Sequence, residues 1–159
     1  MPTSTEALAR RVAVALIALL SVAGCGEESD GLEKYPVRGS VLVNGKPAEM
    51  MAVTFHNSDA NAPGNASRPV AVTDAEGRFT LSTNADKDGA IPGEYLVTFF
   101  WSSENGPSAY DRLGGRFQNP KASTFKVQVG RKENDLEPFK LDVDSKAPKP
   151  ARKIQALPQ

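Results

Sequence analysis

The chain has 159 residues, and its 19 lysine and arginine side chains balance its 19 aspartate and glutamate side chains. This length suits one domain of ordinary size with short tails. The charge balance argues against a nucleic-acid partner, because nucleic-acid-binding domains present a clearly basic face. A single cysteine cannot close an internal disulfide, so the stability of the domain must come from a hydrophobic core.

The first 24 residues have the three parts of an export signal. Arg10 and Arg11 close a short charged stretch, and the unbroken apolar run VAVALIALL follows at residues 12–20. Small residues and the single cysteine come next. A positive n-region, an apolar h-region of about 7 to 15 residues and a small-residue cleavage site are typical of a secretory signal. The run is too short to span a bilayer, which needs about 20 apolar residues.

The cleavage site, Val22-Ala23-Gly24-Cys25, resembles the bacterial lipobox. In that family the thiol of the cysteine is joined to a diacylglycerol, and the signal is cut just before the cysteine. The resemblance implies that Cys25 is the acylated first residue of the mature chain and its anchor to the membrane. Two acyl chains hold a protein durably, whereas one holds it only reversibly. We therefore expect a lipid-anchored protein of the bacterial cell envelope, with its domain outside the cytoplasm.

Two other interpretations of Cys25 stay open. The residue can be a buried small hydrophobe, or an ordinary secretory cleavage site can happen to contain a cysteine. Either would leave the mature chain without a lipid.

Both ends of the mature chain lack hydrophobic periodicity. Residues 25–34 are acidic and contain glycine, which predicts a flexible tether between Cys25 and the domain. Residues 145–159 contain three prolines and four basic residues with no acid, which predicts a disordered basic tail. The folded domain is therefore expected over residues 35–144.

Within residues 35–144, apolar residues alternate with polar ones in short runs, which predicts strands and no long helix. Asn44-Gly45 predicts a tight hairpin turn, because both residues accept a positive φ. Pro92-Gly93 predicts another turn, with the glycine at the position that needs a positive φ. The inward-facing residues of the seven expected strands are Val37, Val41 and Val43; Met51, Val53 and Phe55; Val70 and Val72; Phe79 and Leu81; Tyr95, Val97, Phe99 and Trp101; Phe125, Val127 and Val129; and Phe139, Leu141 and Val143.

The strand that begins near Tyr95 is expected to be central to its sheet. Leu96 and Phe100 make its second face apolar as well, which is typical of a strand covered on both sides. The stretch from residue 102 to residue 123 that follows is irregular. Seven short strands with turns at near-regular spacing favour an all-β fold, an antiparallel Ig-like β-sandwich of two sheets. A small closed barrel permits the same alternation and stays open as an alternative.

Three segments carry a second resemblance, YPVRGSVLVNGKPAEMMAVTF at residues 35–55, AVTDAEGRFTLST at 71–83 and DGAIPGEYLVTF at 88–99. In this order they resemble the carboxypeptidase regulatory-like domain, a transthyretin-like β-sandwich that occurs in many predicted bacterial lipoproteins. The resemblance is strong over residues 35–101 and holds in outline beyond them. It implies an accessory module without catalysis that assists folding, adhesion or ligand contact. We expect such a module to be a monomer without a cofactor.

A hydrolase is the competing class, because the transthyretin-like fold also hosts the hydroxyisourate hydrolases. Those enzymes use several histidines and arginines and a C-terminal Tyr-Arg-Gly-Ser, whereas this chain has one histidine, His56, and ends in Ala-Leu-Pro-Gln. His56 shares a strand face with Thr54, away from the expected core. We therefore expect a solvent-exposed histidine without a catalytic partner.

The only spacing that suggests a metal site is Asp86-Lys87-Asp88-Gly89. Alternate carboxylates followed by glycine match the start of a calcium loop, but the further oxygen ligands and the closing glutamate are missing. An ordinary polar turn without a metal is the better prediction.

Trp101, Tyr110, Arg112 and Phe117 lie in or beside the long irregular stretch and are the candidate ligand-binding residues. Aromatic faces next to polar groups can stack on a sugar or a peptide, and the end loops of sandwiches often carry binding sites. The structural alternative is that these aromatic residues fold back on the core of their own domain. We expect a binding or scaffolding module whose partner is an envelope protein, a glycan or an anionic envelope polymer.

Overall fold

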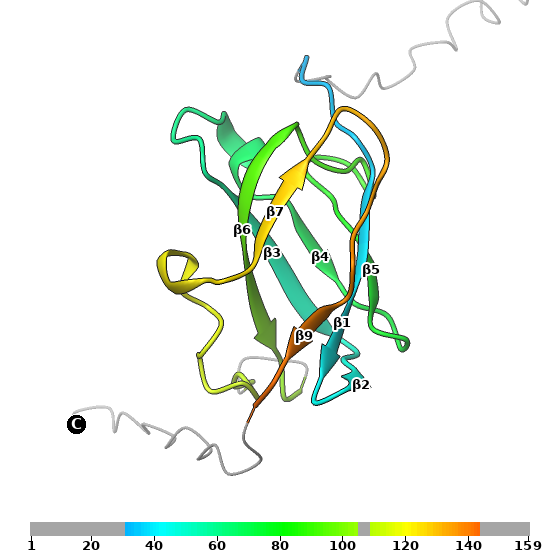
Figure 1. Cartoon of the computed structure of the whole chain (residues 1–159), viewed down its shortest axis with the longest axis vertical. Helices are drawn as coiled ribbons and strands as arrows, with labels where there is room; N and C mark the ends of the chain where they lie inside the picture. The colour runs from blue at the N-terminus through cyan, green and yellow to red at the C-terminus, as the bar shows by residue number, and fades with distance from the viewer. Residues whose placement is uncertain (1–30, 105–108, 144–159) are drawn as a thin grey trace, which may run out of the picture. The chain divides into compact units, whose positions relative to one another are not determined.

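The computed structural model of the chain describes residues 31–104 and 109–143 (Figure 1). The export signal, the lipobox with Cys25 and the tail at residues 145–159 therefore lie outside the described residues. The fold below is that of the compact unit that begins at Glu33. Within residues 31–104 and 109–143, no helix is both long and apolar enough to cross a membrane.

The described residues are all-β, as the alternation of apolar residues predicts. Two short 3-10 helices, η1 (Gly64–Ser67) and η2 (Pro120–Ala122), are the helical segments in these ranges. The strands are β1 (Val37–Val43), β2 (Lys46–Pro47), β3 (Met51–Asn57), β4 (Val70–Val72), β5 (Arg78–Thr80), β6 (Gly93–Trp101), β7 (Lys126–Val129), β8 (Asn134–Asp135) and β9 (Phe139–Leu141).

The strands form two sheets, which makes the fold a β-sandwich (Figure 1). One sheet has the order β4-β3-β6-β7 and is antiparallel throughout. The other sheet is built on β1, which pairs with β2, β5, β8 and β9. β6 lies between β3 and β7, so the prediction that it is a central strand is confirmed.

The prediction of a purely antiparallel sandwich is wrong for the last strands. β8 and β9 run parallel to β1, with Val37 opposite Asn134 and Val41 opposite Phe139. After β7, the chain crosses from one sheet to the other, where β8 and β9 both pair with β1. β9 therefore forms no hairpin with β7. Alternation marks a strand but does not say which sheet it joins. The two-residue strands β2 and β8 also add to the seven that were expected.

The first predicted turn is confirmed and the second is wrong. Asn44 and Gly45 have φ values of 50° and 76° and join the paired strands β1 and β2. Gly93, by contrast, has a φ of 158° and pairs with Val129 as the first residue of β6. The connection before β6 instead has a positive φ at Gly89, where an added Cβ would collide with the backbone carbonyl of Tyr35. Glycine is therefore required four residues before the position predicted.

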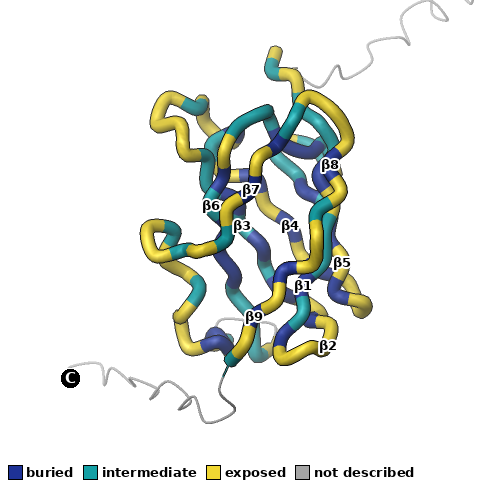
Figure 2. The backbone as a smooth tube through the Cα atoms, viewed as in Figure 1, coloured by how far each residue is buried: buried dark blue, intermediate teal, exposed yellow. Residues whose placement is uncertain are grey.

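The core fills the space between the two sheets with the inward residues of the long strands. Buried residues alternate with partly exposed ones along β3 (Figure 2). Phe55 has no exposed surface, and its ring centroid lies 6.3 Å from that of Phe79 and 6.4 Å from that of Phe139. Gly39 allows this packing, because an added Cβ there would lie 2.7 Å from Cζ of Phe79. Aromatic rings therefore contact one another across the two sheets.

Strand β4 turns its two valines away from the core. Ala71 is 8% exposed, whereas Val70 and Val72 are 48% and 59% exposed. The chain then reverses at Asp74, whose Oδ1 accepts hydrogen bonds from the backbone N–H groups of Glu76 at 3.0 Å and Arg78 at 2.8 Å. Asp74 therefore caps its own turn. Because β5 pairs with β1, the reversal carries the chain from one sheet to the other.

Candidate functional site

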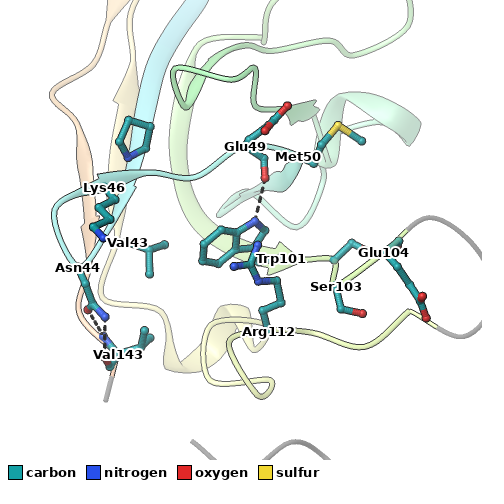
Figure 3. Close-up of a pocket in the computed structure, with 12 residues that line it drawn as sticks. Val43, Asn44, Lys46, Glu49, Met50, Trp101, Ser103, Glu104, Arg112 and Val143 are labelled. Carbon is teal, nitrogen blue, oxygen red and sulfur yellow. Dashed lines mark hydrogen bonds between the residues drawn. The ribbon is translucent and has the colours of Figure 1, made fainter. Parts of the chain in front are cut away.

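An open pocket of about 660 Å³ lies where several connections meet at one end of the sandwich (Figure 3). The walls come from the ends of β1 and β6, from the segments around β2, and from the irregular connection that follows β6. Two of the four candidate residues, Trp101 and Arg112, line this pocket. The pocket is lined by Val43, Asn44, Lys46, Pro47, Glu49, Met50, Trp101, Ser102, Ser103, Glu104, Arg112 and Val143.

Trp101 is the last residue of β6 and is fixed from two directions. In the ladder it stands opposite Met51, and its indole Nε1 donates a hydrogen bond to the carbonyl oxygen of Glu49 at 2.8 Å (Figure 3). The indole has one donor, so this hydrogen bond satisfies it. Trp101 as a whole is partly exposed and is one of the residues that line the pocket.

Arg112 lies on the ring of Trp101. Its Cζ is 3.5 Å from the ring centroid, which is close cation–π contact (Figure 3). The backbone supports this stacking, because the N–H of Arg112 donates to the carbonyl oxygen of Trp101 at 2.8 Å. An exposed contact of this kind contributes about 0.5 to 1 kcal/mol, enough to favour one orientation of the guanidinium.

Asp111 organises the connection that carries Arg112, a role that sequence reasoning missed. Asp111 is 8% exposed, and its Oδ1 accepts hydrogen bonds from the backbone N–H groups of Trp101 and Leu113, each at 3.0 Å. Its Oδ2 accepts hydrogen bonds from the N–H of Gly115 at 2.8 Å and from Nε2 of Gln118 at 2.9 Å. A buried carboxylate costs free energy unless donors surround it, and here four do. The nearest sequence signal is an aspartate three residues before a Gly-Gly pair.

The other two candidate residues lie outside the pocket lining. Tyr110 is 38% exposed, and its backbone N–H donates to Oγ of Ser103 at 3.1 Å. Phe117 is partly buried against the core, with its ring centroid 6.2 Å from that of Phe125. Phe117 therefore folds back on its own domain, as in the structural alternative weighed for these residues.

In the acidic turn after β5, the carboxylate of Asp88 binds backbone groups of the same turn. The carboxylate of Asp88 accepts hydrogen bonds from the backbone N–H groups of Thr83 at 2.6 Å, Asn84 at 3.1 Å and Ala85 at 3.2 Å. Nζ of Lys34 lies 3.7 Å from the same carboxylate. Among the residues that the structure describes, no group of three or more histidine, cysteine or acidic side chains is placed to hold a metal ion.

His56 is half-buried, so the expectation of a fully solvent-exposed side chain is wrong. Its Nε2 lies 2.8 Å from Oγ1 of Thr98, which is 6% exposed. Leu96 of β6 stands opposite His56 in the ladder, so a neighbouring strand covers part of the ring. Burial lowers the pKa of His56, and the positive charge of Arg68 lowers this pKa further.

This pKa shift predicts a loss of stability in acid. The unfolded chain binds a proton at His56 more readily than the folded domain does, so protonation favours unfolding. The loss should begin as the pH falls below about 6.5, the unfolded pKa, and be complete below the folded pKa. We expect the urea midpoint of His56→Gln to fall less between about pH 7.5 and about pH 5 than that of the wild type. An equal fall in the two proteins would contradict this assignment.

Comparisons with known proteins leave the family open. No family model matches the chain, and no curated protein matches it. A 9R-lipoxygenase from Cyanothece PCC8801 shares 17% identity over 82% of this chain with a TM-score of 0.39, and this match spans 20% of the lipoxygenase. A protein of Pseudomonas aeruginosa named for carbohydrate binding shares 14% identity over 73% of this chain and 92% of its own, with a TM-score of 0.38. A dioxygenase domain from Streptomyces sp. SirexAA-E shares 20% identity over 75% of this chain and 86% of its own, with a TM-score of 0.39. These similarities are too low to support an argument about function.

Proposed function

We propose that this protein is a binding module without catalytic activity, held at the bacterial cell envelope by a lipid on Cys25, and that the Trp101 pocket is its binding site. The observation that carries the proposal is the fixed stack of Arg112 on Trp101 at the wall of an open pocket. The carboxypeptidase regulatory-like, transthyretin-like identity of the domain is part of the same proposal. It rests on the sequence of residues 35–101.

Preformation of the pocket supports a binding role. Asp111 holds the connection after β6, and the hydrogen bond from Trp101 to Glu49 fixes the indole, before any ligand arrives. A site that is already ordered loses less conformational entropy on binding. The walls combine an aromatic ring, aliphatic side chains and a few charged groups, which is the composition of many ligand sites.

A hydrolase is the second candidate, and the hydrogen bond between His56 and Thr98 is the observation that favours it. A histidine bonded to a hydroxyl is the pairing of a general base with a nucleophile. Thr98, however, is 6% exposed, so a substrate has little access to its hydroxyl. Turnover of hydroxyisourate or of an ester by the purified chain, abolished in His56→Ala, would establish this alternative and overturn ours.

Retention on envelope material tests the binding role. We expect the full-length chain, purified in mild detergent, to be retained on immobilised envelope polysaccharide, and Trp101→Ala to lose this retention while remaining folded. Tyr110→Ala is the matched control, because it removes an aromatic side chain of the same connection that does not line the pocket. Equal retention of wild type and Trp101→Ala, or failure of the wild type to bind, would contradict the proposal.

A further inference from the structure

Two basic side chains line the Trp101 pocket without an acidic partner. Within residues 31–104 and 109–143, neither Lys46 nor Arg112 makes an ion pair. Three described arginines do so, among them Arg38, whose Nη2 lies 3.5 Å from Glu133, and Arg78, whose Nη2 lies 2.9 Å from Glu76. Arg68 and Arg116, like Arg112, make no ion pair within these ranges. The charges of Lys46 and Arg112 are therefore not taken up by an ion pair within the described residues.

The position of Arg112 suits a carboxylate better than a diffuse negative charge. One face of its guanidinium lies on the ring of Trp101, which leaves the N–H groups at the edge of the plane to reach outward. A guanidinium presents these donors as a rigid fork that matches the two oxygens of a carboxylate. No hydrogen bond from the side chain of Arg112 to another residue occurs in the described part of the chain.

The pocket also holds two acidic residues, and one of them, Glu104, lies away from Lys46. Figure 3 shows Lys46 at one end and Glu104 at the other, with Trp101 and Arg112 between them. Glu49 contributes its backbone carbonyl to the indole, and its carboxylate makes no ion pair among the described residues. A carboxylate ligand would meet less repulsion from Glu104 at the end that holds Lys46.

The location of the pocket favours a glycan over an extended peptide. Its lining residues belong to strand ends and connections, not to the length of one strand edge. Extended peptides gain most of their affinity by adding a strand to a free edge. A sugar needs no such edge, because its carbon surface can contact Trp101, Val43 and Pro47 while its charged group reaches Arg112.

We propose that the Trp101 pocket recognises an acidic glycan, with the carboxylate of one sugar bound by Arg112, the positive charge of Lys46 adding attraction, and the sugar ring lying against the apolar wall. This inference rests on the proposed function, because it names the ligand class of the same site. It adds a requirement that the proposed function lacks, namely that binding depends on a negative charge on the sugar.

A polymer with and without its charge tests this requirement. We expect the full-length chain in mild detergent to bind polygalacturonate at least about tenfold more tightly than the fully methyl-esterified polymer, which keeps the sugar backbone and loses the carboxylates. Arg112→Gln should remove this difference, since it removes the charge and the fork. Arg116→Gln is the matched control, because it removes an exposed arginine of the same connection that does not line the pocket and should keep the difference.

Three results with the two polymers would overturn the inference. They are equal affinity for the two polymers, no binding of either polymer, and equal weakening of polygalacturonate binding by Arg112→Gln and Arg116→Gln. Inorganic polyphosphate binding as tightly as polygalacturonate would also overturn it, because the pocket would then select charge and not a carboxylate. If Trp101-dependent retention on envelope polysaccharide persists in any of these cases, the inference fails and the proposed function stands. If that retention does not depend on Trp101, the proposed function fails.

Discussion

Replacing Cys25 with serine should release the protein from the membrane almost completely. The sulfur of Cys25 is the atom to which the lipid would be attached, and about 0.8 kcal/mol per buried methylene makes anchoring by two acyl chains stable. In fractionated bacteria we expect the wild type in the membrane pellet and Cys25→Ser in the soluble fraction. Labelled fatty acid should be incorporated into the wild type alone.

The matched control moves the thiol without removing it. The double variant Cys25→Ser, Ser29→Cys keeps one cysteine in the same segment but places it outside the lipobox, so it should also be soluble and unlabelled. If Cys25→Ser stays in the membrane fraction after its signal is removed, or if the wild type takes up no fatty acid, the lipid anchor is wrong.

Phe79→Ala should destabilise the domain by about 3 to 5 kcal/mol. Phe79 is 4% exposed, and its ring lies 6.1 Å from that of Phe139 and 6.3 Å from that of Phe55. Gly39 lies against the same ring, and the backbone there has no side chain that can fill the cavity. Small domains are stable by about 5 to 15 kcal/mol in total, so this one substitution removes a large share of the stability.

Urea unfolding of Phe79→Ala and Val72→Ala measures this prediction. Val72 is 59% exposed on β4, so its truncation should change the free energy of unfolding by less than about 0.5 kcal/mol. A loss below about 1 kcal/mol in Phe79→Ala would mean that this ring is not part of a tightly packed core.

The strands of the core could be predicted because alternation is a local property of the sequence. Val37, Val41 and Val43 lie buried in β1, and Met51 and Phe55 lie buried in β3, as their spacing indicates. In a strand of three residues, alternation does not decide which face is buried. In β4 the buried residue is Ala71, which lies between the two valines. The direction of β9 could not be predicted, because it depends on which sheet the chain enters after β7.

The candidate site could be predicted only where its residues are close together in the sequence. Trp101 and Arg112 follow from an aromatic strand end beside an irregular connection, and both line the pocket. Lys46 and Glu49 reach the pocket from a segment more than 50 residues earlier, and this contact exists only after the two sheets have formed. The role of Asp111 is also visible only when its four donors are brought together.

Tryptophan fluorescence tests the central claim most directly, because Trp101 is the one tryptophan of the chain and lies in the proposed binding site. We predict that the emission of the full-length chain changes saturably when it is titrated with solubilised envelope polysaccharide. The concentration dependence should match that of retention on the immobilised polysaccharide. Retention without any change in emission would place the binding surface elsewhere on the domain, and no retention with no change would contradict the binding role itself.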